Sequence, residues 1–275
     1  MPEGPEVKLT AENINFYSKN NKIINCKILC GRYVRHGPPE GYEDFLKKLP
    51  LNIIKIYSKG KGIFIELSNN VYIYNTLGMS GSWSSTRDKH CGFEFILEKI
   101  DDNKLSKKLY FRDIRNFGYM KFLHNKNEFD KILNRWGPDI LNKNTNLEIF
   151  KERIKKHLNK NITKVLMNQS IVSGIGNYIK AEALYKSKIS PLRTMNSLSD
   201  EEVKLLFNSL KKIAESSYKL NGNTIRTYQN FEGVKGNYES LLKVYMKKKD
   251  PLGNNVIKIT TEDRRTTHWV PEIQK

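Results

Sequence analysis

The sequence predicts an α+β protein with a β-rich first half, a helical second half and a short hairpin near its C-terminus. In the first half, short apolar runs alternate with polar turns. In the second half, apolar residues recur every three or four positions, which is the spacing of a helix face. Strand-like alternation returns at Val256–Thr260. The length of 275 residues fits one large domain or two ordinary ones.

The first half contains a clear hairpin pattern. Ile63–Leu67 and Val71–Tyr74 are strand-like and flank the polar turn Ser68–Asn70. Many short strands with regular turns are typical of a β-sandwich or a barrel. Further strand-like runs, the first two joined by a turn at Asp101–Asn103, are Phe93–Leu97, Lys108–Phe111 and Tyr119–Leu123.

Helices are expected at the start of the chain and beyond residue 136. Pro5 suits the first turn of a helix, where its missing N–H costs nothing. A capping box formed by Ser199 and Glu202 starts a long helix that Asn221–Gly222 ends. The apolar positions that define the predicted helix faces are Val7, Ala11, Ile14, Leu147, Phe150, Ile154, Leu158, Val203, Leu206, Phe207, Leu210, Ile213, Ala214 and Ser217.

The charge balance points to an anionic partner. Lys and Arg number 48 against 29 Asp and Glu, which gives a formal net charge of +19. Such an excess repels itself in a folded protein, and a nucleic acid is the usual reason to carry it. The alternative is a surface that is basic only for solubility.

The sequence also argues against a membrane protein, a secreted protein and a disulfide-rich or zinc-binding cysteine framework. No apolar run approaches the ~18–20 residues of a membrane helix, and the first residues lack a signal peptide's pattern. The three cysteines Cys26, Cys30 and Cys91 make no disulfide framework and no C-x-x-C pair. We therefore expect an intracellular protein, nuclear or cytoplasmic, that is not secreted and has no membrane partner.

The N-terminus carries candidate chemistry. Removal of Met1 before the small residue Pro2 exposes a secondary amine. An α-amino group has a pKa of about 7.7–8 against about 10.4 for Lys, so more of it is neutral and able to attack a carbonyl carbon. Glu3 and Glu6 can hold this amine and move protons. The alternative is a tail with helix-start residues.

Pro2–Val7 resembles the opening of the Fpg/Nei family of DNA glycosylases. The resemblance implies that Pro2 is the nucleophile of a Schiff base, that Glu3 is the main acid and base, and that Glu6 supports them. Lys61, in the glycine-flanked turn Ser58–Gly62, matches the family's hairpin lysine, which is catalytic and reaches a phosphate.

Two further loops resemble the family elements that fill the gap left by a flipped base. Leu77–Gly81 supplies Met79, and Arg115–Gly118 supplies Arg115 and Phe117. Apolar and planar side chains offset the unstacking cost of base flipping, which is a few kcal/mol. The alternative for Met79 and Phe117 is ordinary core packing.

Gln169–Tyr178 resembles the hairpin of the family's helix–two-turns–helix motif. Gly174, Gly176 and Asn177 would then bind a DNA phosphate at the start of a helix. Glu182, further along this helix, is expected to be structural.

The C-terminus departs from the family's usual zinc finger, because no cysteine follows Cys91. Arg265–Gln274 resembles the second strand of a zincless finger, with Val270 and Ile273 in place of cysteines and Trp269 as an anchor. Arg265 would grip the phosphate at the lesion. We expect no metal, no zinc and no other cofactor.

The resemblance implies a fold with an N-terminal β-sandwich, a helix–two-turns–helix domain and a C-terminal zincless-finger hairpin. The expected boundaries are 1–136 for the catalytic domain, 137–146 for a connector, 147–240 for the DNA-binding domain and 241–275 for the finger.

The expected function is that of a monomeric DNA glycosylase and AP lyase of base excision repair, acting on damaged DNA. It would remove oxidised pyrimidines and ring-damaged guanine products, then nick the strand by β,δ-elimination. The alternatives are an Fpg-like enzyme for 8-oxoguanine and formamidopyrimidines, or a DNA-damage-binding module without catalysis. Thr224–Tyr238 resembles the family's lesion-covering loop, and the subclass resembles Nei-like enzymes, with a large DNA virus as one candidate source.

Overall fold

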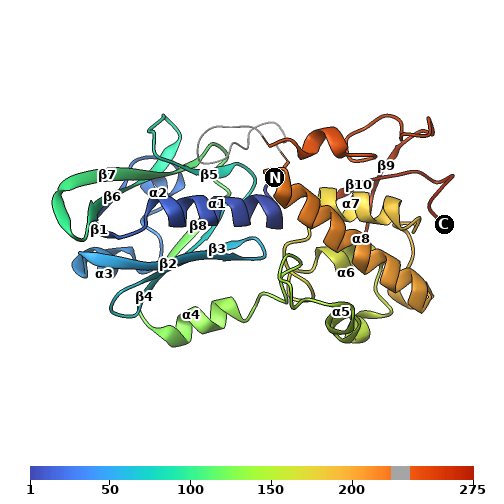
Figure 1. The fold of residues 1–275 in the computed structure, drawn as a ribbon, viewed down its shortest axis with the longest axis horizontal. Helices are drawn as coiled ribbons and strands as arrows, with labels where there is room; N and C mark the ends of the chain where they lie inside the picture. Colours follow the sequence, from blue (N-terminus) through green and yellow to red (C-terminus); the bar gives the residue numbers. More distant parts are fainter. Residues whose placement is uncertain (224–235) are drawn as a thin grey trace. The chain divides into compact units, whose positions relative to one another are not determined.

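The computed structural model describes residues 1–223 and 236–275, and only the backbone of 102–105. The chain divides into two compact units (Figure 1). Unit 1 comprises Met1–Pro2, Glu6–Asn134 and Asn221–Asn237. Unit 2 comprises Glu3–Pro5, Arg135–Leu220 and Tyr238–Lys275.

Unit 1 is built on an antiparallel eight-stranded sheet with the order β5-β7-β6-β1-β2-β3-β4-β8. Strands β1 and β2 pair only at Lys22↔Asn52 and Ile23↔Leu51, so the sheet folds there into two layers. This is the predicted β-sandwich. Its elements are α1 (Gly4–Tyr17), β1 (Asn21–Ile28), α2 (Arg32–Arg35), α3 (Tyr42–Lys47), β2 (Leu51–Lys59), β3 (Gly62–Leu67), β4 (Val71–Thr76), β5 (Gly81–Ser84), β6 (Cys91–Lys99), β7 (Asp102–Asp113), β8 (Tyr119–Leu123) and α4 (Lys126–Leu133).

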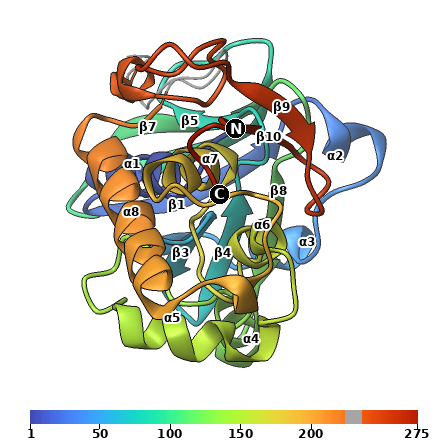
Figure 2. The same cartoon turned by 90° about the vertical axis from the view of Figure 1, so that its right-hand side faces the viewer.

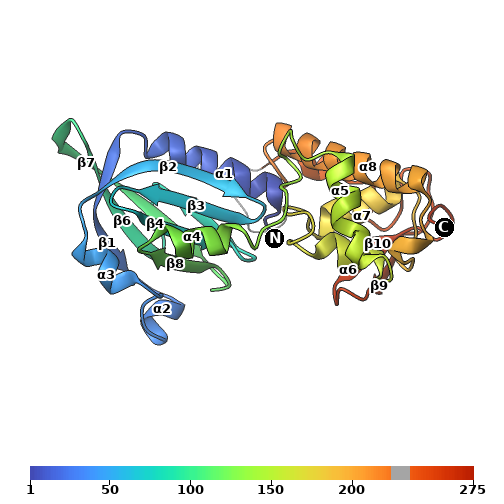
Figure 3. The ribbon, with the colours of Figure 1, turned by 90° about the horizontal axis from the view of Figure 1, so that it is seen from below.

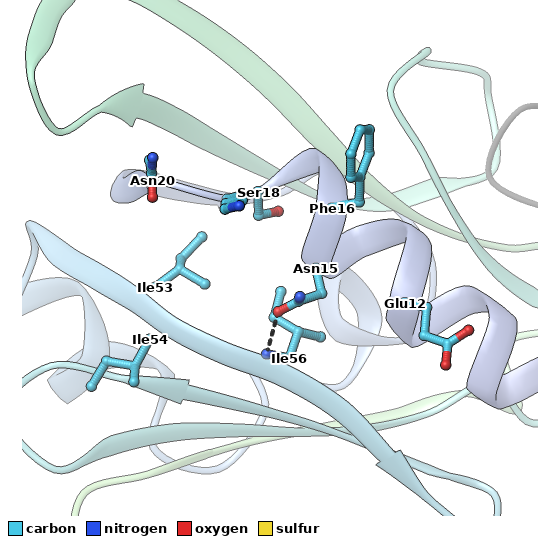
Figure 4. Close-up of a pocket in the computed structure, with 9 residues that line it drawn as sticks. Glu12, Asn15, Phe16, Ser18, Asn20, Ile53, Ile54 and Ile56 are labelled. Atoms are coloured by element: carbon cyan, nitrogen blue, oxygen red, sulfur yellow. Dashed lines mark hydrogen bonds between the residues drawn. The ribbon is translucent and has the colours of Figure 1, made fainter.

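Helix α1 closes the core of this unit. Its predicted stripe, Val7, Ala11 and Ile14, is fully buried among the strand residues. The helix lies along β2 in Figure 3, where the Asn15 Oδ1 accepts a 2.9 Å hydrogen bond from the Ile56 N–H. Figure 4 shows this bond at the wall of a cavity of about 480 Å³ between the two elements. The Asn15 side-chain amide therefore accepts the hydrogen bond of a backbone N–H group in β2 that does not pair with β1.

The predicted hairpin is confirmed. Strands β3 and β4 pair from Gly62↔Thr76 to Leu67↔Val71. Asn69 and Asn70 at the turn have φ of 60° and 55°, the left-handed conformation that Asn tolerates and that matches the strand twist. A second tight turn joins β2 to β3 at Gly60, with φ of 58°, and Lys61.

Helix α4 was not predicted. Asn125 caps it by accepting from the Glu128 N–H at 2.9 Å, and Phe129 and Ile132 are its buried residues. An eight-residue helix shows too few turns of its apolar stripe to stand out in a sequence. The strand pattern predicted for the first half therefore omitted this helix.

Unit 2 contains a helical group, shown in Figure 2 with α8 beside α7, followed by a two-stranded sheet. The predicted capping box is present, since the Ser199 side chain accepts from the Glu202 N–H and the Glu202 side chain from the Ser199 N–H. The elements are α5 (Leu147–Ile154), α6 (Ile162–Met167), α7 (Asn177–Lys186), α8 (Asp200–Lys219), β9 (Ile257–Thr260) and β10 (Thr266–Trp269), with 3-10 turns at Lys155–His157, Met195–Ser197 and Tyr238–Leu241.

One predicted helix position is wrong. Leu158 was expected to continue the buried face of α5, but the α-helix ends at Ile154 and tightens into the turn Lys155–His157. The tighter turn rotates the next side chain away from the helix stripe, and Leu158 is exposed.

The C-terminal hairpin pairs β9 with β10 from Thr266↔Thr260 to Trp269↔Ile257. Val270 is fully buried in a small apolar cluster with Ala181 and Val244, and Ile273 packs against that cluster. Trp269 is only half-buried, so Val270 rather than Trp269 is the anchor. In residues 1–223 and 236–275 no helix combines the length and the hydropathy that crossing a membrane requires.

Candidate active site

The carboxylate of Glu3 lies at the start of α7. Its Oε1 accepts from the Tyr178 N–H at 2.9 Å, and its Oε2 accepts from the Ile179 N–H at 3.3 Å. The residue is 2% exposed. The first N–H groups of a helix have no partner within the helix, and the helix dipole favours negative charge at this end. Glu3 therefore has one fixed orientation.

Two glycines make room for this carboxylate. A Cβ at Gly176 would lie 2.1 Å from the Glu3 Cδ. Gly174, with φ of +95°, accepts from the Gly4 N–H through its carbonyl oxygen at 2.8 Å. The glycine pair thus holds the segment Glu3–Gly4 against α7.

The sequence predicted that Gly174 and Gly176 bind a DNA phosphate. In the structure, the Gly174 N–H donates to the Gln169 Oε1 at 3.0 Å, and the two N–H groups of α7 described above donate to Glu3. The anion-binding end of the helix is therefore occupied by a carboxylate of the same chain. An N-terminal residue that folds back over more than 170 positions leaves no local pattern to detect.

Glu6 is fully buried within unit 1. Its Oε1 accepts from the Asn223 N–H at 2.7 Å, and a Cβ at Gly222 would lie 3.0 Å from the Glu6 Cγ. Glu6 therefore holds the chain where the predicted lesion loop begins. Most of that loop, residues 224–235, lies outside the described part.

Pro2 and Lys61 also belong to unit 1. Pro2 is buried, and Lys61 is half-buried at the tip of the β2–β3 turn. A two-residue turn between paired strands fixes the position of its tip. The backbone of Lys61 is therefore rigidly placed.

Met79, Arg115 and Phe117 lie on two neighbouring loops at the surface of unit 1. Met79 is 37% exposed and Phe117 is 54% exposed. The Arg115 Cζ lies 5.0 Å from the centroid of the Phe117 ring. The alternative interpretation, that Met79 and Phe117 pack in the core, is therefore wrong.

The two loops that carry this cluster are fastened by Asp113, which sequence reasoning missed. Its Oδ1 accepts from the Ser80 hydroxyl at 2.7 Å, and its Oδ2 accepts from the Gly118 N–H at 2.6 Å. The Ser80 hydroxyl in turn accepts from the Arg115 N–H at 3.0 Å. An Asp two residues before a turn is a common local cap and was the available signal.

Asn177 lies against the C-terminal hairpin in unit 2. Its Nδ2 donates to the Thr266 carbonyl at 2.8 Å, next in sequence to Arg265. Its Oδ1 is buried and has no hydrogen-bond partner among the described residues. Arg265 is exposed. The structure thus brings Asn177 to the strand that follows Arg265.

A buried ion pair sits beneath the turn that carries Arg265. The Lys180 Nζ lies 2.5 Å from the Asp263 Oδ2, with side-chain exposures of 0% and 3%. Burial lowers the pKa of Lys180, and the Asp263 carboxylate acts in the opposite direction. The Asp263 Oδ1 also accepts from the Thr261 hydroxyl at 2.5 Å. This contact between residues 83 positions apart was not predicted.

The described residues contain no group of three or more His, Cys, Asp or Glu that could hold a metal ion. Glu182 accepts from the N–H groups of Lys243, Val244 and Tyr245, so its expected structural role is confirmed. His268 packs edge-on against Tyr245, with ring centroids 5.0 Å apart.

Family models match almost the whole chain. Residues 1–120 match the formamidopyrimidine-DNA glycosylase N-terminal domain. Residues 136–229 match its H2TH domain, and residues 237–275 match its C-terminal domain.

Relatives and solved structures agree with these matches. The formamidopyrimidine-DNA glycosylases of Listeria monocytogenes and Oceanobacillus iheyensis are 30% and 32% identical to this chain. The matches cover all of this chain, and 100% and 98% of those proteins. A MutM structure in complex with carbocyclic 8-oxo-G containing DNA is 26% identical, with a TM-score of 0.84 and full coverage of both chains. A Lactococcus lactis FPG variant with Fapy-dG containing DNA is 26% identical, with a TM-score of 0.85 and the same coverage.

This fold, in which the carboxylate that follows Pro2 binds the N-terminus of a helix, is that of a base-excision DNA glycosylase. The chain belongs to the formamidopyrimidine-DNA glycosylase family. The predicted family, fold class and enzyme class, a DNA glycosylase with AP lyase activity, are confirmed.

Proposed function

We propose that the protein excises ring-damaged guanine bases from DNA through a Schiff base at Pro2. The observation that carries this proposal is the fixed carboxylate of Glu3, directly after Pro2 in the chain. A buried carboxylate bonded through both oxygens is a pre-oriented proton carrier.

The chemistry follows from an amine and a carboxylate. The Pro2 nitrogen attacks the sugar C1′, and the bond from C1′ to the damaged base breaks, with the base leaving as it gains a proton. The nitrogen loses its proton, the C1′–O4′ bond breaks as O4′ gains a proton, and the opened sugar is held as an iminium. Glu3 removes a proton from C2′, and the electron pair expels the 3′ phosphate. A second elimination expels the 5′ phosphate.

Borohydride reduction tests this step. It should link the protein to lesion DNA, with the link mapped to residue 2 by mass spectrometry. An uncleaved tag before Pro2 turns its amine into an amide and should abolish both activities, whereas the same tag after Lys275 should not. A link mapped to Lys61 or full activity of the N-terminally tagged protein would reject the assignment.

Damaged DNA is the proposed partner, bound by a single chain. Lys61, Asn177 and Arg265 are proposed phosphate ligands, together with the backbone at Gly176. The backbone N–H of Gly174, which was also expected to bind a phosphate, donates to Gln169 instead. The +19 net charge supports an electrostatic contribution. Each phosphate contact contributes about −0.9 to the slope of log K against log salt. Arg265→Ala should reduce that slope by about one and cut turnover. An unchanged slope would remove Arg265 from the interface.

Lesion choice is proposed in two parts. Relatives are named for formamidopyrimidines, which supports ring-damaged guanine as the principal substrate. The C-terminal hairpin without cysteine resembles Nei-like enzymes, which supports oxidised pyrimidines as a second class. A panel of single-lesion oligonucleotides tests both. Faster cleavage at 8-oxoguanine than at ring-damaged guanine or at oxidised pyrimidines would favour the alternative, an Fpg-like enzyme that acts on 8-oxoguanine.

Base flipping is proposed to use Met79, Arg115 and Phe117 as the void-filling group, since their loops are fastened and their side chains are exposed. Substituting 2-aminopurine next to the lesion reports unstacking by its fluorescence. Triple replacement of these residues by alanine should remove the fluorescence rise without unfolding the protein.

We propose that the C-terminal hairpin needs no zinc and the enzyme no other cofactor. The packing of Val270 and Ile273 in an apolar cluster and the Lys180–Asp263 pair support this. Chelators should leave activity intact. One tightly bound zinc per chain in elemental analysis would overturn the proposal.

An intracellular location is also proposed. Cys26, Cys30 and Cys91 are free thiols, which suits a reducing compartment. A thiol-labelling assay in intact cells would detect their oxidation, and full oxidation would argue against this location.

A further inference from the structure

A cavity of about 570 Å³ opens in unit 2 between α7, α8 and the segment that follows residue 237. Its volume lies within the range of cavities that hold small ligands or side chains of a partner, ~300–1,000 Å³. Ile213 and the Tyr238 ring form its buried floor. Leu241 and Leu252 stand exposed at its rim, at 45% and 76%.

Three lysines share this rim. Lys186, Lys212 and Lys243 line the cavity and are exposed. The ion pairs described within unit 2 use other cations, so these three have no carboxylate partner in the described part of the chain. Lys186 and Lys212 lie close together, and burial, then the charge of Lys212, lowers the pKa of Lys186.

Two carboxylates belong to the surroundings of the cavity, Glu182 in its lining and Asp250 next to the lining residue Pro251. Glu182 accepts from the backbone N–H groups of residues 243–245 at 2.8–2.9 Å. Asp250 accepts from the Tyr185 hydroxyl at 3.0 Å and from Asn254. Both are therefore hydrogen-bonded by the protein itself. The Glu182 carboxylate also attracts the charge of Lys243, so the rim keeps an excess of positive charge, greatest at Lys186 and Lys212, beside apolar surface.

This cavity is not on the face of α7 proposed to meet DNA. Lys186 follows Asn177 by nine residues, and at about 100° per residue the two side chains project from opposite sides of the helix. A duplex also offers phosphates without an apolar group to fill the floor. An acidic peptide offers both carboxylates and large apolar side chains.

We propose that this cavity docks a short acidic segment of a partner protein, with an apolar side chain on Ile213 and Tyr238 and carboxylates paired to Lys186, Lys212 and Lys243. The site is independent of the glycosylase function. Close charge pairs at a partly desolvated rim give specificity, and a buried apolar anchor gives affinity.

A labelled peptide, acetyl-Glu-Asp-Leu-Phe-Asp-Glu-amide, tests the site by fluorescence anisotropy at 150 mM salt. A second peptide has Ser in place of Leu and Phe, and a third has Gln and Asn in place of the acids. We expect the first to bind at least tenfold more tightly than either. Equal binding of the Ser peptide would mean general attraction to a basic protein and would overturn the proposal.

Variants locate the site. Lys186→Glu with Lys212→Glu should weaken peptide binding at least tenfold, and Leu252→Ser should weaken it severalfold. Lys204→Glu with Lys219→Glu, at two exposed lysines of α8 outside the cavity, changes the net charge equally, so it is the matched control and should change binding less than twofold. All these side chains are exposed, and melting curves check that the variants fold. Equal weakening by the control, or displacement of the peptide by stoichiometric lesion DNA, would refute the site.

Discussion

The carboxylate of Glu3 is 2% exposed and bonded to two backbone N–H groups, whereas Phe117 is 54% exposed and has the Arg115 guanidinium over its ring. In the first region the functional side chain itself is fixed. In the second, Asp113 fixes the loops and leaves the side chains uncovered. A proton carrier needs one geometry, but a group that fills a gap in stacked bases must be exposed before it meets DNA. Changes in the two regions should therefore have different consequences.

The largest effect is expected at Glu3 itself. Glu3→Gln keeps the shape and one acceptor oxygen but removes the proton carrier, so base excision should fall by about 10²–10⁴-fold. Single-turnover cleavage of a lesion duplex measures this. Glu12→Gln, an exposed glutamate of α1, is the control and should retain activity. Excision within a few fold of the parent would end the assignment of Glu3.

The glycine that makes room for the Glu3 carboxylate should be nearly as sensitive to substitution as Glu3 itself. Gly176→Ala places a Cβ 2.1 Å from the Glu3 carboxyl carbon, so the carboxylate must move and excision should fall by up to about 10²-fold. Gly92→Ala is the control, because its nearest neighbour would be at an ordinary 3.5 Å. If Gly176→Ala were as active as Gly92→Ala, the close approach would have no catalytic meaning.

A smaller effect is expected in the exposed region. Phe117→Ala should lower excision about tenfold and leave the melting temperature unchanged, because little apolar surface is uncovered. Phe16→Ala, at an 82% exposed phenylalanine of unit 1, should change neither quantity. A melting temperature that fell with Phe117→Ala alone would show that Phe117 supports the fold, and the contrast between the regions would fail.

The smallest effect on catalysis is expected from His268, a buried group of unit 2. Burial, then the charges of Lys258 and Lys180, lowers its pKa from 6.5 to about 4. Between these values the unfolded chain binds a proton that the folded chain does not, so the free energy of unfolding should fall as the pH drops from about 6.5 to about 4. The loss is at most about 3 kcal/mol.

Denaturant melts at pH 7 and pH 4.5 measure this pH dependence. His268→Phe, which can still pack against Tyr245, should show a smaller loss between the two pH values. Activity at pH 7 should not change. Equal losses in the parent and the variant would assign the acid sensitivity to other groups.

Local patterns in the sequence predicted much of the fold. The Ser199–Glu202 capping box and the Asn69–Asn70 turn each depend on neighbours within a few positions, and both are present. Leu158 and the short helix α4 were misread, since a brief or tightening helix breaks the regular spacing. Residues of the proposed site came from a family resemblance combined with the chemistry of an N-terminal amine.

The contacts that hold the site could not be predicted in the same way. Glu3 meets Tyr178, and Lys180 meets Asp263, across long stretches of chain. Neither partner is marked by its own neighbours, and burial of an ion pair is known only once the packing is known. Glycine at 176 was noticed, but its spacing fits a phosphate as well as a carboxylate.

The backbone contacts of the Glu3 carboxylate affect which substitutions this enzyme can accumulate during evolution. The groups that hold the carboxylate are peptide N–H groups, which every residue except proline carries. Drift in the side chains at 178 and 179 therefore cannot delete them. The hydrogen-bond geometry depends instead on the absence of a side chain at Gly176, where an added Cβ would lie 2.1 Å from the Glu3 Cδ. The side chains at 178 and 179 are thus restricted by their packing in the core and not by the hydrogen bonds to the proton carrier.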